Sequence, residues 1–326
     1  MKALAVDLGG THATCGLMED HTILARKTID TDSAENLRDV LPRIGDAFRD
    51  LVKRESLAFA DFSGVTVGFA GLVDSRIGRV VGTNKKYVDA PEVDLSAWSR
   101  QAFGLPLRVE NDARIALLGE RYAGAARGFA DVVMMTLGTG LGGAAMIEGK
   151  LLRGKHAQAG CLGGHLPVLF TGRPCTCGSI GCAEAEAAGW SLPAILKDWP
   201  GASESALSKY AQIGFKELFE EGSRGDDVAI AIRERCLRVW AVNAVALVHA
   251  YDPELIVVGG GVMESANVII PYIESYVHRY AWTPWGKVHV LPAELGNYAA
   301  LVGAIPLLLE DQATQSPMIP QRGSLE

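Results

Sequence analysis

The sequence predicts a mixed α/β protein made of two similar halves that face a common cleft. Strand-like and helix-like patterns alternate along the 326 residues, and no Pro/Ser-rich linker divides them. Residues 5–18 and residues 134–147 also share one form, in which a strand, a polar glycine turn and a second strand follow one another. We therefore expect each half to bring one such hairpin to the cleft.

The first half begins with three strand patterns and a helix pattern. Residues 2–9 form an apolar run typical of a buried strand. Residues 13–20 alternate apolar and polar side chains, and residues 23–30 favour the third strand of a meander. Residues 33–55 carry apolar side chains at helical spacing, and residues 63–74 indicate a strand followed by a loop.

The remaining patterns continue this alternation. Residues 105–125 indicate a strand, a turn and a helix, and residues 131–150 indicate a hairpin with a glycine-rich turn. Residues 226–265 contain a long helical pattern, then a buried strand, then a turn of three glycines. The order of these elements predicts a mixed α/β fold.

Composition excludes several classes of protein. Apolar residues make up 48% of the chain and charged residues 21%, so a packed core is easily formed. The formal net charge of −7 argues against general nucleic-acid binding, which needs a basic surface. The N-terminus lacks the apolar region of a signal peptide, and no stretch approaches the roughly 20 apolar residues of a membrane span. We expect a soluble cytoplasmic protein.

Two glycine turns are candidate phosphate-binding sites. Asp7 ends a strand and is followed by Gly9, Gly10 and Thr11, where backbone N–H groups can approach a phosphate and Asp7 can hold Mg²⁺ through a water. The second turn contributes Gly138, Thr139 and Gly140 in the same way. Taken alone, each segment also fits a plain hairpin turn. Neither is a P-loop or a dinucleotide-binding fingerprint.

Polar residues and glycines at two further strand ends extend this set. Glu110, Asn111 and Asp112 lie between a strand and a helix, where Asn and Asp are also common helix caps. Asp112 at the mouth of a cleft could accept a proton from an alcohol that attacks a phosphate. Gly259 to Gly261 follow a buried strand and leave room for a flat ring, although close helix packing explains them equally well.

Three cysteines and a histidine predict a closed zinc site. Cys175, Cys177 and Cys182 lie within "CTCGSIGC", and His165 precedes them by ten residues. Three thiolates and one imidazole match the four tetrahedral ligands of structural zinc. Cys161 is a more distant competitor. The remaining cysteines, Cys15 and Cys236, fall in strand and helix patterns and are expected in the core.

The same segments resemble the ROK family (repressors, open reading frames and sugar kinases). The residues that carry the resemblance are "DLGGTHAT", "GFAGLVD", "ENDARIALLGE", "TLGTGLGG", "GGH", "CTCGSIGCAE" and "VVGGGVM", in the order and spacing of the family. The resemblance extends from about residue 3 to residue 308. The cysteine motif is its most specific part, and the similarity is greatest to bacterial glucokinase-like hexose kinases.

The resemblance implies an α/β fold of the actin-like ATPase (ribonuclease H-like) class, with two domains around a cleft. The first domain would span residues 1–115 and be completed by a C-terminal helix at 300–311. The second would span residues 116–299 and carry a zinc-binding loop at 165–182. ATP and sugar would bind between the two domains, and the family resemblance implies dimers or tetramers.

The resemblance also implies an activity and a role for each candidate residue. The activity is ATP-dependent phosphorylation of a hexose hydroxyl, usually the one at C6, with Mg²⁺ as cofactor, structural zinc, and Asp112 as the base. The implied sugar-binding residues are Gly71, Asn84, Asn111, Asp112, His165 and Glu184. The implied ATP- and phosphate-binding residues are Asp7, Gly9, Gly10, Thr11, Gly138, Thr139, Gly140, Gly259, Gly260 and Gly261. His165 can serve zinc, sugar or both.

Two points bear on which member of the family this is. The family also contains sugar-responsive repressors, which carry a helix-turn-helix segment before the first turn. Here Asp7 lies so near the start of the sequence that we expect no such segment. A sugar-binding protein without kinase activity is a further alternative. The family also usually has a Glu in the motif E-x-G-H, but here Leu162 or, with one inserted glycine, Cys161 takes its place. Neither side chain accepts hydrogen bonds as a carboxylate does, so the resemblance leaves the sugar open.

Overall fold

Two five-stranded sheets with the same internal order form the framework of the protein. The computed structural model describes residues 1–32, 34–83 and 85–313. The first sheet has the order β3-β2-β1-β4-β7 and the second β10-β9-β8-β11-β12. The strands of the first sheet are β1 (Lys2–Leu8), β2 (His12–Glu19), β3 (Thr22–Asp30), β4 (Val65–Phe69) and β7 (Leu107–Asn111). Those of the second are β8 (Val132–Leu137), β9 (Leu141–Ile147), β10 (Lys150–Leu151), β11 (Leu255–Gly259) and β12 (His289–Pro292).

Strand directions repeat from one sheet to the other. In the first sheet β1 and β2 are antiparallel, β2 and β3 are antiparallel, and β1, β4 and β7 run parallel. In the second sheet β8, β9 and β10 form the antiparallel part, while β8, β11 and β12 run parallel. The prediction of two similar halves, each with one glycine-turn hairpin, is therefore confirmed.

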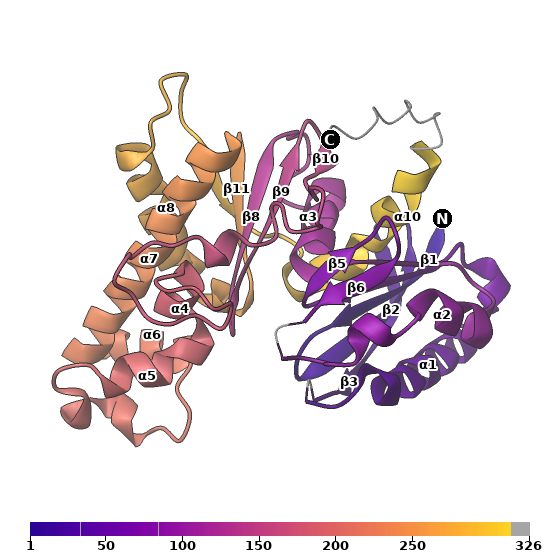
Figure 1. The fold of residues 1–326 in the computed structure, drawn as a ribbon, viewed down its shortest axis with the longest axis horizontal. Helices are drawn as coiled ribbons and strands as arrows, with labels where there is room; N and C mark the ends of the chain where they lie inside the picture. The colour runs from indigo at the N-terminus through magenta and orange to yellow at the C-terminus, as the bar shows by residue number, and fades with distance from the viewer. Residues whose placement is uncertain (33, 84, 314–326) are drawn as a thin grey trace, which may run out of the picture.

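Helices cover both sheets, and the two sheets lie in separate halves of the molecule (Figure 1). In the first half α1 packs on β2 and β3, while the C-terminal helices α9 and α10 pack on β1. The helices of this half and of the C-terminus are α1 (Leu37–Arg54), α2 (Leu95–Phe103), α3 (Asp112–Ala123), α9 (Ala299–Val302) and α10 (Ala304–Ala313), and a short hairpin is formed by β5 (Leu72–Asp74) and β6 (Arg79–Gly82). The helices of the second half are α4 (Ala183–Ala187), α5 (Leu192–Lys197), α6 (Phe215–Ser223), α7 (Asp227–Tyr251) and α8 (Ala266–Tyr280).

The longest helix, α7, has clear end signals. The carboxylate of Asp226 caps its N-terminus by accepting a hydrogen bond from the N–H of Ala229 at 2.8 Å. At the other end Asp252 adopts the left-handed conformation with φ of 48°, which stops the helix before β11. The fully buried Trp240 and Cys236 face the core from α7, so Cys236 is a core residue as predicted. Cys15, predicted for the core of the first half, is also fully buried.

Helix α3 lies between the two halves and touches both. It packs against β4 and β7 of the first sheet, against β8 and β9 of the second, and against α9 and α10. Two glycines allow the closest approach: a Cβ atom on Gly119 would lie 2.1 Å from the carbonyl oxygen of Ala299, and one on Gly303 would lie 2.0 Å from that of Ile115. The backbones of α3 and the C-terminal helices are therefore in direct contact.

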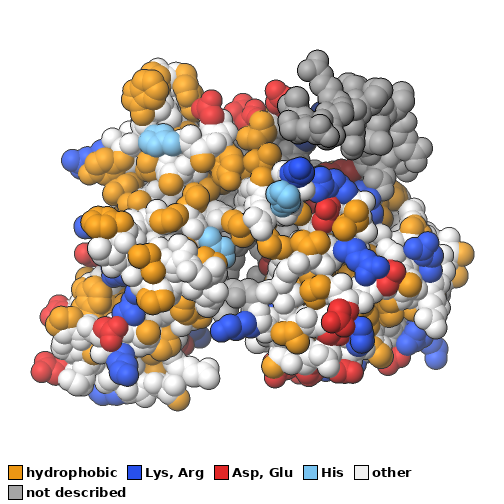
Figure 2. Space-filling model, viewed as in Figure 1, with side chains coloured by type: hydrophobic (Ala, Val, Ile, Leu, Met, Phe, Trp, Pro, Cys, Tyr) orange, Lys and Arg blue, Asp and Glu red, His pale blue; other side chains and the backbone are white. Residues whose placement is uncertain are grey.

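The surface is hollowed between the two halves on the face shown in Figure 2. The first residue of α3, Asp112, and the last residue of β1, Leu8, belong to elements of the first half, whereas the loop at 152–182 belongs to the second.

Among the described residues, no helix is both long and apolar enough to cross a lipid bilayer.

We predict that Gly119→Ala destabilises the protein by about 1–3 kcal/mol or more, because the added methyl group overlaps the carbonyl oxygen of Ala299 and forces α3 away from α9. The free energy of unfolding from urea titration measures this. Gly45→Ala in α1 is the matched control, since there a Cβ would meet only the flexible guanidinium of Arg49 at 3.3 Å. The control should be neutral or stabilising by up to about 1 kcal/mol. Equal effects of the two substitutions would contradict the close contact.

Candidate active site and metal centre

Two carboxylates of the first half, Asp7 and Asp112, interact electrostatically near the edge of the sheet where β1, β4 and β7 end. The register places Leu8 beside Phe69, and Phe69 beside Asn111, so the carboxyl ends of these parallel strands meet at one edge. Burial, and then the negative charge of Asp112, raise the pKa of Asp7 to about 7. Asp7 and Asp112 were predicted from separate motifs, and the structure brings them together.

Asp112 is the first residue of α3 and is half-buried. Burial raises the pKa of Asp112. The hydrogen bond from the Ala113 N–H and the positive charge of Lys86 lower this pKa, but by less than burial raises it. The Asn111 side chain holds this carboxylate in place: its Nδ2 donates to Asp112 Oδ1 at 2.8 Å and to the Gly71 carbonyl oxygen at 3.1 Å. Gly71, Asn111 and Asp112 thus form one connected group.

The group around Asp112 contains part of the predicted sugar-binding set. Gly71 is required there, because a Cβ atom would lie 2.8 Å from the carbonyl oxygen of Gly82. Asn84, also predicted to line the sugar site, lies outside the described residues. Lys86, which the sequence did not single out, is half-buried and acts on Asp112 electrostatically. Nothing in the sequence around Lys86 distinguishes it from its exposed neighbour Lys85.

The first glycine turn joins β1 to β2, and a tyrosine hydroxyl is hydrogen-bonded to its backbone. The N–H of Gly9 donates to the carbonyl oxygen of His12 at 3.1 Å, which closes the turn. The hydroxyl of Tyr87 donates to the carbonyl oxygen of Gly9 at 2.7 Å. Gly10 and Thr11 form the tip, and Thr11 is exposed. Sequence reasoning missed Tyr87, whose partner lies 78 positions away along the chain.

The second glycine turn joins β8 to β9 and is held by the segment after α4. The carbonyl oxygen of Gly138 accepts a hydrogen bond from the N–H of Gly189 at 2.9 Å, and that of Thr139 accepts from the N–H of Trp190 at 3.0 Å. The N–H of Gly138 donates to the carbonyl oxygen of Gly140 at 3.0 Å. The turn is therefore a supported backbone loop, as a phosphate-binding turn requires.

The turn at Gly259–Gly261 lies against the second glycine turn. Gly260 has a φ of 96°, and a Cβ atom there would lie 2.2 Å from the carbonyl oxygen of Leu137, so only glycine fits. A Cβ atom built on Gly138 would lie 3.9 Å from the backbone nitrogen of Gly261. The structure thus brings together the two glycine segments that were predicted to contact phosphate and nucleotide in the second half.

Glu184 contacts the second glycine turn. Its Oε2 accepts a hydrogen bond from the N–H of Leu141 at 3.0 Å, and a Cβ atom on Gly140 would lie 3.0 Å from the same oxygen. Sequence reasoning placed Glu184 with the sugar, and that role stays a prediction. In the structure Glu184 contacts the backbone of the second glycine turn. Along the sequence Glu184 lies only two residues beyond Cys182.

The predicted zinc ligands form a single cluster. Ligand atoms of His165, Cys175, Cys177 and Cys182 all lie within 4.8 Å of one another. The Cys175 Sγ lies 3.5 Å from the Nδ1 of His165, and the Sγ atoms of Cys177 and Cys182 are 3.7 Å apart. Zn–S bonds near 2.3 Å and Zn–N bonds near 2.0 Å place tetrahedral ligands roughly 3.5 Å (S to N) and roughly 3.8 Å (S to S) apart.

The geometry and chemistry of this cluster therefore fit zinc. Burial, and then hydrogen bonds with the neighbouring thiols, raise the pKa of Cys182 to about 12, so three thiolates can coexist here only around a cation. Cys161, the alternative ligand, is not in the cluster; its Sγ lies 3.5 Å from the carbonyl oxygen of Gln158. His165 is placed with the cysteines through its Nδ1.

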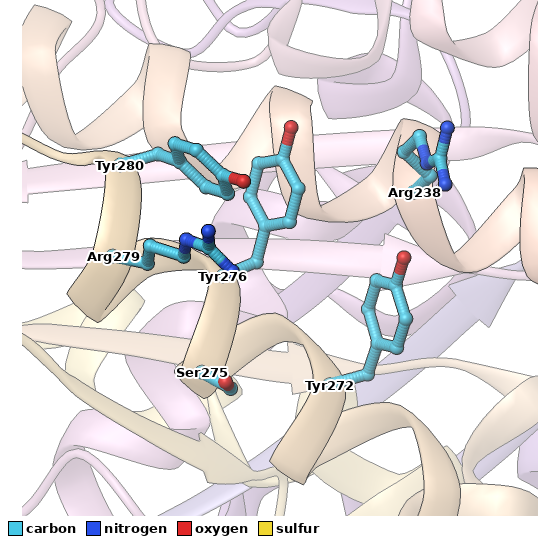
Figure 3. Close-up of a pocket in the computed structure, with 6 residues that line it drawn as sticks. All are labelled: Arg238, Tyr272, Ser275, Tyr276, Arg279 and Tyr280. Carbon is cyan, nitrogen blue, oxygen red and sulfur yellow. The ribbon is translucent and has the colours of Figure 1, made fainter.

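A separate cavity of about 470 Å³ is lined by residues of α7 and α8 (Figure 3). The rings of Tyr276 and Tyr280 lie 4.4 Å apart, and the guanidinium of Arg279 lies 5.2 Å from the centre of the Tyr280 ring. The other lining residues are Arg238, Tyr272 and Ser275. None of the residues predicted for the site lines this cavity.

The strand order and directions of both sheets define the actin-like ATPase fold, as predicted. A ROK hexokinase from Thermus thermophilus has the same fold: its structure is 30% identical, with a TM-score of 0.79, and the match covers 96% of this chain and 100% of that one. The structure of a ROK family glucokinase from Streptomyces griseus in complex with glucose and AMPPNP is 32% identical, with a TM-score of 0.79, covering 94% and 99% of the two chains.

The family model described as ROK matches residues 3–311, and the protein belongs to the ROK family. The glucokinase of Thermotoga maritima is 30% identical over 317 residues, which cover 95% of this chain and 98% of that protein. The family predicted from the sequence motifs is therefore confirmed.

We predict that the purified protein contains about one zinc ion per chain, because the four side chains match a closed tetrahedral site. Cys177→Ser removes one ligand and should weaken zinc retention against a chelator by more than about tenfold, with a lower midpoint of thermal unfolding. Elemental analysis and chelator competition measure these effects. Cys161→Ser is the matched control and should keep its zinc. Metal-free wild-type protein with an intact loop would contradict the prediction.

We predict that Asp7 makes stability depend on pH between about 4 and 7 in the absence of magnesium and nucleotide. The Asp7 pKa is raised from 3.8 to about 7, so the folded state binds more protons in this range and the free energy of unfolding falls as pH rises. Asp7→Asn should therefore be more stable than the wild type by roughly 2–4 kcal/mol at pH 8, and by no more than about 1 kcal/mol at pH 4.5.

Urea titration at both pH values measures the Asp7 effect. Asp50→Asn is the control: Asp50 is exposed, and the hydrogen bond from Lys27 lowers its pKa, so no gain at pH 8 is expected. A stability difference between Asp7→Asn and the wild type that stays constant from pH 4.5 to pH 8 would show that the carboxyl is not perturbed.

Proposed function

We propose that this protein is an ATP-dependent hexose kinase that phosphorylates the hydroxyl at C6. The observation that carries the proposal is the half-buried Asp112, which interacts electrostatically with Asp7 near the sheet edge and has a raised pKa. The relatives named glucokinase, together with the solved glucokinase that holds glucose and AMPPNP, support the same activity.

Asp112 is the base in the proposed reaction. It accepts the proton of the attacking sugar hydroxyl as the oxygen bonds to the γ-phosphorus, and the bond from phosphorus to the oxygen of ADP breaks. A raised pKa favours this role, because a base works best when its pKa lies near the working pH. Asn111 orients the carboxylate through its 2.8 Å hydrogen bond and binds the sugar beside it.

The two glycine turns hold the phosphates in this proposal, one from each half. Asp7, Gly9, Gly10 and Thr11 serve the first turn, and Gly138, Thr139 and Gly140 the second. Gly259 to Gly261 lie beside the nucleotide, which fits their contact with the second turn. The Asp7–Asp112 pair of carboxylates suits a divalent cation with oxygen ligands, and Mg²⁺ bound near Asp7 would neutralise phosphate charge. These assignments correspond to one domain of residues 1–115 with 300–311 and another of 116–299.

The sugar lies between Asp112 and the segment before the zinc loop. Gly71, Asn84, Asn111, His165 and Glu184 line it in this proposal. The position that usually holds a Glu is filled here by Cys161 or Leu162; Cys161 is buried with its thiol turned to the carbonyl oxygens of its own loop, and Leu162 is half-buried. A site without that carboxylate should reject changes at C2 less strongly. We place the enzyme in the cytoplasm and expect a homodimer or homotetramer.

The test is a coupled ADP-release assay with a panel of hexoses, run on the wild type and on Asp112→Asn. The wild type should phosphorylate glucose, mannose and 2-deoxyglucose with kcat/KM values within about tenfold of one another. Asp112→Asn keeps the shape of the side chain but cannot accept the proton, so kcat should fall by roughly 10²-fold or more while sugar affinity changes less.

Asp39→Asn is the control for Asp112→Asn, because Asp39 is an exposed carboxylate in the first turn of α1. A wild type that binds hexose but releases no ADP would point to a sugar-responsive or sugar-binding protein and overturn the proposal. Near-normal turnover by Asp112→Asn would show that Asp112 takes no part in the chemistry and only begins helix α3.

A further inference from the structure

A fully buried carboxylate lies directly before the two residues proposed to handle the sugar. Glu110 and Arg114 have no exposed side-chain surface, and Glu110 is the penultimate residue of β7. Neither side chain has a part in the proposed reaction. A buried charge costs several kcal/mol of desolvation unless it is paired and hydrogen-bonded, so its partners determine what Glu110 does.

Both oxygens of Glu110 are hydrogen-bonded. Oε1 accepts from the N–H of Asn111 at 2.9 Å and from the Nη1 of Arg114 at 3.3 Å. Oε2 accepts from the Nε of Arg153 at 2.7 Å. Two guanidinium groups therefore converge on one carboxylate, and the third contact fixes the backbone of the residue next to Asp112.

The two arginines connect Glu110 to parts of the chain far away in sequence. Arg114 Nη2 donates to the carbonyl oxygens of Ala157 and Ala159 at 3.1 and 2.6 Å. Arg153 follows β10 in the second half, and its Nη2 donates to Glu310 of α10 at 2.5 Å. We call Glu110, Arg114, Arg153 and Glu310 the ion cluster.

The ion cluster thus joins the turn that carries Asp112 to the segment at 153–161. That segment runs on into the short 3₁₀ helix Gly163–His165, which ends at a zinc ligand. On the other side, Asn111 is held twice: its N–H donates to Glu110, and its Oδ1 accepts from the N–H of Arg114 at 3.2 Å. These ion pairs and hydrogen bonds therefore link the turn that carries Asp112 to the segment at 153–161.

We propose that Glu110 and Arg153 are positioning residues that hold the Asp112 turn and the segment at 153–165 as one unit across the junction of the two halves. The catalytic consequence rests on the proposed function, in which these two parts of the chain lie on opposite sides of the sugar. A displacement of about 1 Å at a reacting group can cost about 10²-fold in rate, so a weakened cluster should reduce kcat more than it raises KM.

The test compares Arg153→Met, Glu110→Gln and the double variant with the wild type in the full-length protein. Amide hydrogen exchange should become at least about tenfold faster in both peptides that cover residues 107–118 and 153–165, with segments other than these and α10 unchanged. With hexose and ATP, kcat should fall by about 10- to 100-fold, while KM changes by less than about threefold. The double variant should lose clearly less than the product of the two single losses, because both substitutions remove the shared Glu110–Arg153 pair.

Two further variants distinguish positioning from general destabilisation. Arg224→Met removes an exposed arginine that pairs with Glu221 at 2.5 Å, the length of the Arg153–Glu310 pair, remote from the cluster in sequence. It should leave kcat and the exchange of residues 107–118 and 153–165 unchanged. Arg153→Lys keeps the charge but loses the planar fork, and should recover part of the kcat of Arg153→Met. If Arg153→Met does not fold, Arg153→Lys carries the same expectation with a smaller loss.

Exchange that rises in only one of the two segments, or kcat within about twofold of the wild type, would overturn the proposal. Losses that multiply in the double variant would also overturn it, because independent effects multiply. A wild type without phosphoryl transfer would instead refute the proposed function alone, since the coupled exchange of the two segments is measured without substrate.

Discussion

The direct contact between α3 and the C-terminal helices is the constraint on which the other features depend. Gly119 and Gly303 let two helix backbones meet, and any side chain at either position would overlap a carbonyl oxygen of the opposite helix. Helix α3 also packs against both sheets, so its N-terminus lies at the junction of the halves. The place of Asp112 relative to the second glycine turn therefore follows from helix packing rather than from the loop around it.

The same junction supplies the electrostatic conditions of the site. Burial raises the pKa of both Asp7 and Asp112, which weakens the folded state at neutral pH but suits the base and the cation-binding carboxylate that we propose. Glu110 is buried more deeply than either, and its carboxylate is paired with two arginines. Neighbouring carboxylates thus differ in role because their partners differ, not because of their own chemistry.

Local patterns made much of this predictable. The glycine-turn hairpins and the zinc ligands follow from spacing within short segments, and His165 is only ten residues from Cys175. The ion cluster could not be predicted, because Arg153 is separated along the chain by 43 positions from Glu110 and by 157 positions from Glu310. Sequence periodicity carries no information on such pairs; only the packing of α3, β10 and α10 brings them together.

Glu184 shows how the metal centre and the nucleotide side of the protein are connected. Cys182 is the last ligand of the cluster and the N-cap residue of α4, and Glu184 lies in the first turn of that helix. The Oε2 of Glu184 accepts a hydrogen bond from the N–H of Leu141, which directly follows the second glycine turn. The segment beyond α4 donates a backbone hydrogen bond to the carbonyl oxygen of Gly138. Zinc at the cluster would fix the start of α4 and, through Glu184, the backbone that is proposed to hold phosphate. A structural metal at this cluster would therefore act on catalysis by holding a turn rather than by touching substrate.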